Sequence, residues 1–264
     1  MKSNGESPTA SWSGRASVQI FRSVRDLLLS KWILVAFPII LIPFFIALYT
    51  VIDPPEGVKD WPEAFVIFAI FIYMQILVLM FSLIYGTSII NEEMESRTVT
   101  YLFLRGSKRF EVLLYKFAGV YISLALMFTV STFLTFITFS LHTSTDVMTD
   151  HIMILLSLLG AQYFGLFAYL SLFSLMGVVF KRPLVIGLIF AFFWEFFMVN
   201  IELNVAQVTI MYYIRSIFLG TEAVRQYTDF DDKASVAGSI IGLAMLGMAF
   251  LTLAGIALSR KDVH

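Results

Sequence analysis

The chain has no cysteine, three histidines and few charged residues. Without cysteine, disulfides, zinc–thiolate sites and cysteine nucleophiles are excluded. Charged residues make up 14% of the 264 residues and hydrophobic residues 59%, whereas soluble domains carry roughly 25% charged residues. One water-soluble core cannot bury so much apolar surface, so the composition predicts a polytopic membrane protein. The net charge of −1 gives no indication of a nucleic-acid partner.

The sequence also lacks the common catalytic and nucleotide-binding motifs. It has no HExxH, no GxSxG and no GxxxxGK[ST] pattern, so we expect no catalytic residue, no metal ligand and no P-loop ATP site in this chain. Glu92–Arg97 fits the glutamate-pair-plus-arginine pattern of intramembrane CAAX-type proteases, which also need nearby histidines. His142 and His151 lie at the other end of the predicted third span, roughly 38 Å away by helical rise. An intramembrane protease is therefore a minor alternative.

Six apolar segments are long enough, or nearly so, to cross about 30 Å of hydrocarbon as helices. All are uncharged except the fifth, which contains Glu195. None alternates like a barrel strand. The expected fold is an all-α polytopic membrane protein with one domain, residues 15–264, after a flexible polar tail, residues 1–14. The predicted spans are Trp32–Ile52, Ala64–Ile90, Phe117–Leu141, Ile152–Phe180, Leu184–Ile201 and Ala234–Leu258.

The basic residues predict the orientation of these spans. With the N-terminus in the cytoplasm, 14 of the 18 Lys and Arg residues fall in inside segments, and the outside loops are acidic. Because cytoplasmic loops are enriched in Lys and Arg, both termini and the segment 91–116 are predicted to be cytoplasmic. We expect a multi-pass integral membrane protein.

An amphipathic helix precedes the first span, within Arg15–Lys31. Helical periodicity places its apolar residues on one face and its basic residues on the other. It is expected to lie along the inner leaflet as a membrane anchor, or to dock a cytoplasmic partner. The interfacial residues are Ile20, Phe21, Val24 and Leu28.

The longest inside segment, residues 91–116, combines four acidic and five basic residues with an apolar pattern of helical spacing. Gly106 suits the end of one helix and Ser107 the start of the next. The segment is interpreted as a helix, a short turn and a second helix at the inner surface. A solvated connection is the alternative, but it requires no apolar stripe, so a protein-docking surface is favoured.

Glu202–Lys233 is too polar to span and too apolar for a free loop. It is predicted to form one or two short helices dipping into the outer leaflet, with a break at Gly220. Glu195 is interpreted either as a pathway or gating contact, or as a neutral acid bonded to a neighbouring helix or a residue nearer the outer surface than the predicted span implies. The small residues Gly238, Gly242 and Gly247 predict close packing of the last span against another helix.

This pattern resembles the type-2 permease family of ATP-binding-cassette (ABC) transporters. The most specific stretch is "GTSIINEEMESRTVTYLFLRGSKRFEVLLYKFAGV", residues 86–120. It is similar to the family's run of a glutamate-rich span exit, a Thr, a Leu-rich turn, a basic turn and a Lys opening the third span. The family often has Gly where Arg97 stands and Pro near Gly106.

The resemblance implies a permease subunit, usually of an exporter, that is not itself an enzyme. A separate ABC ATPase subunit would bind ATP and Mg, and a second copy of the chain or a homologous permease would complete the transporter in the lipid bilayer. The resemblance also implies a prokaryotic plasma (inner) membrane. The implied ATPase-coupling surface consists of Glu92, Glu93, Met94, Glu95, Arg97, Thr98, Tyr101, Leu102, Arg105, Gly106, Lys108, Arg109 and Phe110.

A stand-alone secondary transporter or channel is the second hypothesis. Such a protein needs several intramembrane polar or ionisable groups to couple ions, and the predicted spans supply only Glu195.

Overall fold

The computed structural model describes residues 12–29, 33–52, 61–95, 109–141, 151–198, 207–225, 227 and 234–260, all of them in helices, turns or short connections without strands. The all-α prediction is therefore confirmed for this part of the chain. The helices are α1 (Trp12–Leu28), α2 (Ile33–Ile52), α3 (Trp61–Phe68), α4 (Leu79–Glu95), α6 (Arg109–Leu141), α8 (Ile152–Val179), α9 (Pro183–Phe190), α10 (Ile210–Leu219), α11 (Glu222–Arg225) and α12 (Val236–Arg260), with π-helical segments η1 (Ala69–Val78) and η2 (Ala191–Phe197).

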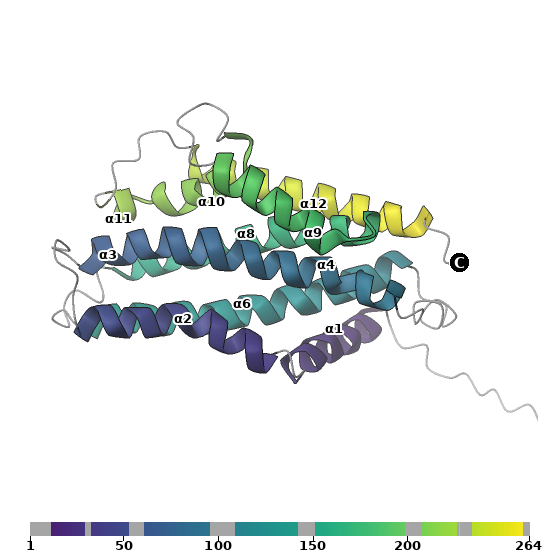
Figure 1. The fold of residues 1–264 in the computed structure, drawn as a ribbon, viewed down its shortest axis with the longest axis horizontal. Helices are drawn as coiled ribbons and strands as arrows, with labels where there is room; N and C mark the ends of the chain where they lie inside the picture. Colours follow the sequence, from purple (N-terminus) through teal and green to yellow (C-terminus); the bar gives the residue numbers. More distant parts are fainter. Residues whose placement is uncertain are drawn as a thin grey trace, which may run out of the picture.

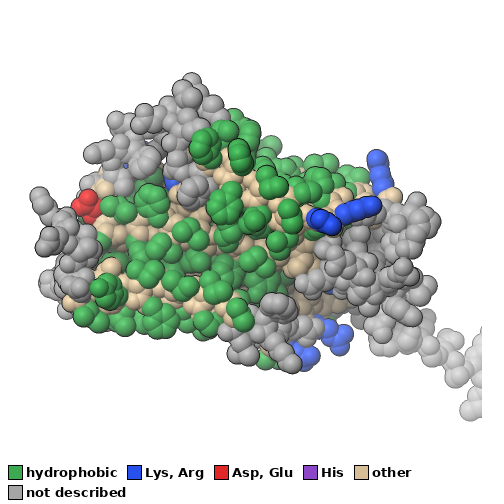
Figure 2. Space-filling model, viewed as in Figure 1, with side chains coloured by type: hydrophobic (Ala, Val, Ile, Leu, Met, Phe, Trp, Pro, Cys, Tyr) green, Lys and Arg blue, Asp and Glu red, His purple; other side chains and the backbone are tan. Residues whose placement is uncertain are grey.

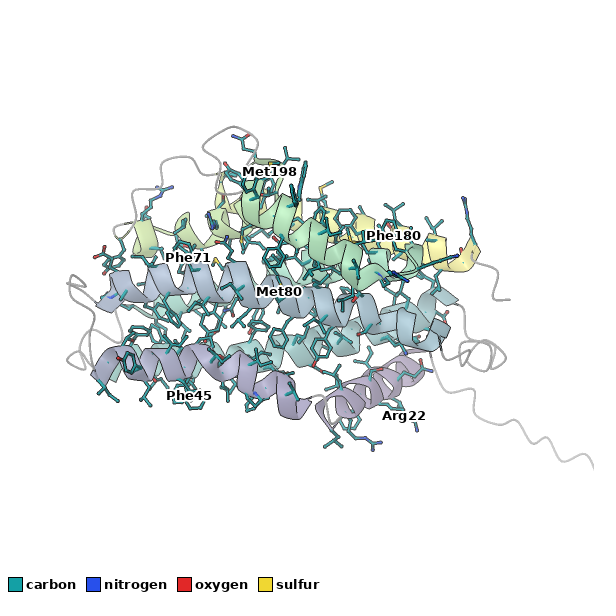
Figure 3. All side chains as sticks on the ribbon, in the orientation of Figure 1. Arg22, Phe45, Phe71, Met80, Phe180 and Met198 are labelled. Carbon is teal, nitrogen blue, oxygen red and sulfur yellow. The ribbon has the colours of Figure 1, made fainter. Side chains whose placement is uncertain are left out.

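Within the described residues, five helices are long and apolar enough to cross a membrane, as expected of an integral multi-pass membrane protein. They cover Val35–Ile52, Pro62–Ile89, Phe110–Ser140, Ile152–Val179 and Val236–Arg260. The fifth predicted span is the exception, because α9 and η2 give a shorter apolar helix, Pro183–Glu195. Phe180 and Met198, on either side of this helix, lie well apart along the long axis of the bundle (Figure 3).

The helices form a bundle around α8, which packs against α4, α6, α9, α10 and α12. In Figure 1, α2 and α6 lie on one side of the rod made by α3, η1 and α4, and α9, α10 and α12 lie on the other. An α-helix that is apolar on all sides is either buried in protein or a membrane span. Helix α8 has no charged residue, which fits both, and its contacts place it at the centre of the bundle.

The two ends of the bundle differ in charge. Helix α1, the end of α4, the start of α6 and the end of α12 lie at one end, and the starts of α3 and α8, with α10 and α11, lie at the other (Figure 1). On the face drawn in Figure 2, most of the described Lys and Arg side chains lie at the first end, an acidic side chain lies at the second, and hydrophobic side chains cover the surface between them. We call the first the basic end and the second the acidic end.

Hydroxyl and amide groups join the long helices inside the bundle. The hydroxyl of Tyr73, in η1, lies 2.8 Å from Ser131 Oγ of α6, and Ser131 Oγ donates to the Ile40 carbonyl of α2 at 2.5 Å. Gln162 Nε2 of α8 donates to Thr132 Oγ1 of α6 at 2.9 Å. Each such bond between membrane helices stabilises by about 0.6–2 kcal/mol. These bonds connect α6 to η1, α2 and α8.

Glycines set the closest approach of α8 to its neighbours. A Cβ on Gly177 would lie 2.7 Å from the Thr87 carbonyl oxygen of α4, a backbone atom that cannot rotate away. A Cβ on Gly165 would lie 2.7 Å from the Ile214 side chain of α10. The Gly177 contact requires a residue without a side chain, so it fixes how near α4 comes to α8, whereas the end of the Ile214 side chain can shift away from a Cβ on Gly165.

Candidate functional site

The predicted coupling surface begins on a helix. The last turn of α4 contains Glu92, Glu93, Met94 and Glu95, and α4 ends at Glu95. Helix α6 begins at Arg109 and continues for 33 residues, about 50 Å at 1.5 Å per residue, which exceeds the about 30 Å of hydrocarbon. The remaining predicted residues lie outside the described part of the chain: Arg97, Thr98, Tyr101, Leu102, Arg105, Gly106 and Lys108.

The start of α6 is held by two other helices at the basic end. The ring of Phe110 packs against Gly255 of α12 so closely that a Cβ on this glycine would overlap it. A Cβ on Gly119 would likewise overlap Ser23 of α1. Phe110, which was expected on the docking surface, contacts α12 and keeps 38% of its surface exposed. Helices α1 and α12 therefore both pack against the first turns of α6 at this end.

The three glutamates in the last turn of α4 have an unfavourable position. A helix C-terminus carries a partial negative charge, so each acidic residue there costs about 0.3–1 kcal/mol at low ionic strength. The last turn of α4 has no basic residue to offset this. The cluster does not stabilise its own helix, so any compensating basic group lies outside this turn.

Helix α1 forms as predicted but begins at Trp12, within the segment expected to be a tail. Its face toward α6 includes Ser23 and half-buried Val24. Ile20 is half-buried and Phe21 is 70% exposed. The predicted apolar face is thus divided between α6 and the protein surface. The side chain of Leu28 is not among those described.

Glu195 caps a helix that lies elsewhere in the sequence. It is 1% exposed in η2, and its Oε2 accepts from Tyr169 Oη at 2.6 Å and from the Met211 N–H at 3.0 Å. Its Oε1 accepts from the Ile210 N–H at 3.2 Å. The first N–H groups of a helix have no partner within the helix. The Glu195 carboxyl group therefore satisfies two of these donors on α10, and the Thr209 side chain accepts from the Tyr212 N–H at 3.2 Å.

A second charged residue, Arg215, is buried one turn further along α10. It is 9% exposed, and its Nη2 donates to Gln75 Oε1 of η1 at 2.6 Å. Sequence reasoning counted Arg215 among the charges of an outer segment and missed its burial. The run "TIMYYIRSIFL" contained the signal, since Arg215 is its one charged residue. An arginine at the centre of a bilayer costs about 2.5–3.5 kcal/mol on insertion scales, so a buried arginine in this bundle is a candidate functional residue.

Tyr169, Glu195, Gln75 and Arg215 form a buried polar cluster around α10. Gln75 lies in η1 and Glu195 in η2, the two π-helical segments among the described residues. π-Helical turns occur frequently at functional sites because they redirect side chains within a helix. The cluster is thus built from both irregular helices and from a short helix, α10, that is itself buried between α8 and α12.

The three small residues of α12 divide into two groups. Gly247 faces the ring of Phe167, and a Cβ there would overlap it. Gly242 has nothing within 4 Å of a Cβ position, and Gly238 meets only Ser235 Oγ near the start of its own helix. Gly247 therefore packs within the chain, whereas Gly238 and Gly242 face no other helix of the described chain.

The described residues contain no group of three or more His, Asp or Glu side chains that could hold a metal ion. His151 precedes α8, and its Nε2 lies 2.9 Å from Tyr227 Oη. This contact is at the acidic end, opposite the end of α4 in Figure 1. His151 is therefore far from the glutamates of α4, as the sequence predicted. His142 lies outside the described residues.

Comparison of the chain with protein-family models finds no match, and comparison with curated proteins finds none. A functional proposal therefore rests on the end of α4, on the buried polar cluster around α10, and on the resemblance within residues 86–120.

Proposed function

We propose that this chain is the permease subunit of an ABC transporter of the type-2 family, acting as an exporter driven by a separate ATPase subunit. In this proposal the shorter helix of α9 and η2 completes a set of six spans, both termini face the cytoplasm, and α10 and α11 enter the membrane from outside. The ATPase binds ATP and Mg, and a second permease completes the transporter in the inner membrane.

The glutamate cluster at the end of α4 carries this proposal. Its position opposes the helix dipole, so it is expected to face a basic partner. The next described helix, α6, is packed against α1 and α12 at the same end. A displacement of this end by a partner would reach α1, α4, α6 and α12 together, which is what transmission of work from an ATPase requires.

Charge reversal tests the coupling role. In Glu92→Lys/Glu93→Lys, lysines at the α4 C-terminus interact favourably with the helix dipole, so α4 itself is not weakened. Like charges facing a basic partner cost several kcal/mol, so substrate-stimulated ATPase activity of the complex should fall at least about tenfold. Glu63→Lys is the matched control, since Glu63 is exposed in the first turn of α3, at the other end of the same rod.

Membrane insertion of both variants should equal that of the wild type. Full coupling in Glu92→Lys/Glu93→Lys, or an equal loss in Glu63→Lys, would contradict the proposal.

A stand-alone secondary transporter is a second candidate, and the buried cluster favours it. Intramembrane ionisable residues mark ion and substrate pathways, and the structure adds Arg215 to Glu195. The two candidates differ in their energy source. Purified chain in vesicles should show no ion-driven flux without ATP if it is a permease subunit, and such flux would establish the second candidate.

A further inference from the structure

Arg215 and Gln75 form a pair in the interior of the bundle. Gln75 is 2% exposed and lies at the middle of the candidate span Pro62–Ile89, and Arg215 is 9% exposed on α10. Among the described residues, no carboxylate forms an ion pair with Arg215, because the nearby Glu195 accepts from Tyr169 and from the first N–H groups of α10. A guanidinium is held in the interior of the bundle with a neutral amide as its hydrogen-bonded partner.

The pair leaves donors unused. Arg215 Nη2 donates to Gln75 Oε1 at 2.6 Å, while Arg215 Nε and Gln75 Nε2 are buried without a hydrogen-bond partner. Nε and Nη2 are the two nitrogens of one edge of a guanidinium, the edge that binds carboxylate or phosphate with two parallel hydrogen bonds. Here a single amide oxygen occupies an edge suited to two oxygens. Buried donors without partners are rare and require an explanation.

We propose that Arg215 and Gln75 form a binding site for an oxyanion, the carboxylate or phosphate group of an acidic ligand. Its two oxygens displace Gln75 Oε1 and accept from Arg215 Nε and Nη2, and Gln75 rotates so that Nε2 donates to the same ligand. All three donors are then satisfied, and the charge of Arg215 is neutralised.

The acidic group can belong to a soluble solute or to the headgroup of an anionic lipid. The identification of this ligand as the transported substrate rests on the proposed permease role. Binding itself is a property of this chain and needs no ATPase, so it is tested separately from coupling.

The test measures anion binding to the full-length purified chain in dodecyl maltoside, a detergent without phosphate or carboxylate. Unfolding temperature is followed against sodium phosphate and sodium acetate, with sodium chloride at equal ionic strength as the reference. A second titration adds phosphatidylglycerol, with phosphatidylcholine as its reference. A ligand that binds the folded state raises the unfolding temperature with concentration, which gives an apparent Kd.

Three variants locate the binding. Arg215→Gln removes the charge and keeps a side chain that can bond to Gln75, and it should weaken binding by about tenfold or more, as expected for loss of a charged hydrogen bond. Gln75→Glu supplies a carboxylate to the same edge of Arg215, and it should fold and abolish binding by occupying the site. Arg225→Gln, which alters an exposed arginine on α11, should bind like the wild type.

Binding of phosphate or acetate assigns the site to a soluble acid, and binding of phosphatidylglycerol alone assigns it to a lipid headgroup. The proposal is overturned if the wild type responds to none of these probes. It is also overturned if binding persists in Gln75→Glu, which remains decisive should Arg215→Gln fail to fold.

Discussion

Glu195→Gln removes one hydrogen-bond acceptor from the group that holds the start of α10. The wild-type carboxyl group accepts from Tyr169 and Met211 on one oxygen and from Ile210 on the other. Glutamine has a single oxygen, so its NH₂ group faces a backbone N–H in either orientation. One buried donor then loses its partner, which costs about 1–3 kcal/mol.

The assay is unfolding of the purified chain in detergent micelles by titration with a denaturing detergent. Glu222→Gln is the matched control, because Glu222 is exposed on α11 and its replacement should change the free energy of unfolding by less than about 0.5 kcal/mol. Glu195→Ala removes all three acceptor contacts and should be more destabilising than Glu195→Gln. If Glu195→Gln is as stable as Glu222→Gln, the carboxyl group does not hold α10, and the structural role assigned to Glu195 is wrong.

Two further substitutions test the packing inside the bundle. Gly177→Ala places a methyl group 2.7 Å from the Thr87 carbonyl oxygen, so it should lower the free energy of unfolding by about 1–3 kcal/mol in the same titration. Gly160→Ala is the control, because a Cβ at Gly160 has nothing within 4 Å, and it should be neutral or stabilise by up to about 1 kcal/mol. Tyr73→Phe removes two hydrogen bonds to hydroxyl groups of α6 and should cost about 0.6–2 kcal/mol, with non-additive loss when combined with Ser131→Ala; additive losses would show that the Tyr73–Ser131 bond contributes nothing.

The long helices were predictable because their apolar runs are local features of the sequence. The first predicted span, Trp32–Ile52, agrees with α2, and the fourth, Ile152–Phe180, with α8. The third span was predicted to begin at Phe117, after a separate inner-surface helix starting at Ser107, and the structure instead has one continuous helix, α6, from Arg109. The first turn of α6 packs against Gly255 of α12 through Phe110, a tertiary contact that a hydropathy window does not contain.

The buried cluster was only partly predictable. Glu195 was found because one charge in an apolar run is conspicuous, and one of the interpretations given to it, an acid bonded to a neighbouring helix, describes its contact with Tyr169 of α8. Its role as the cap of α10 depends on backbone groups of residues 210 and 211, whose position no local pattern encodes. Arg215 was missed because its segment was assigned to the outside.

The most direct test of the central claim is site-specific cross-linking in native membranes. The chain has no cysteine, so Glu93→Cys and Glu63→Cys each provide a single attachment point for a photoactivatable cross-linker. We predict that a nucleotide-hydrolysing protein with a P-loop is captured from position 93, at the end of α4, and not from position 63, at the start of α3. Capture of no such protein from position 93, or labelling of that position by a membrane-impermeant reagent added outside, would contradict the account.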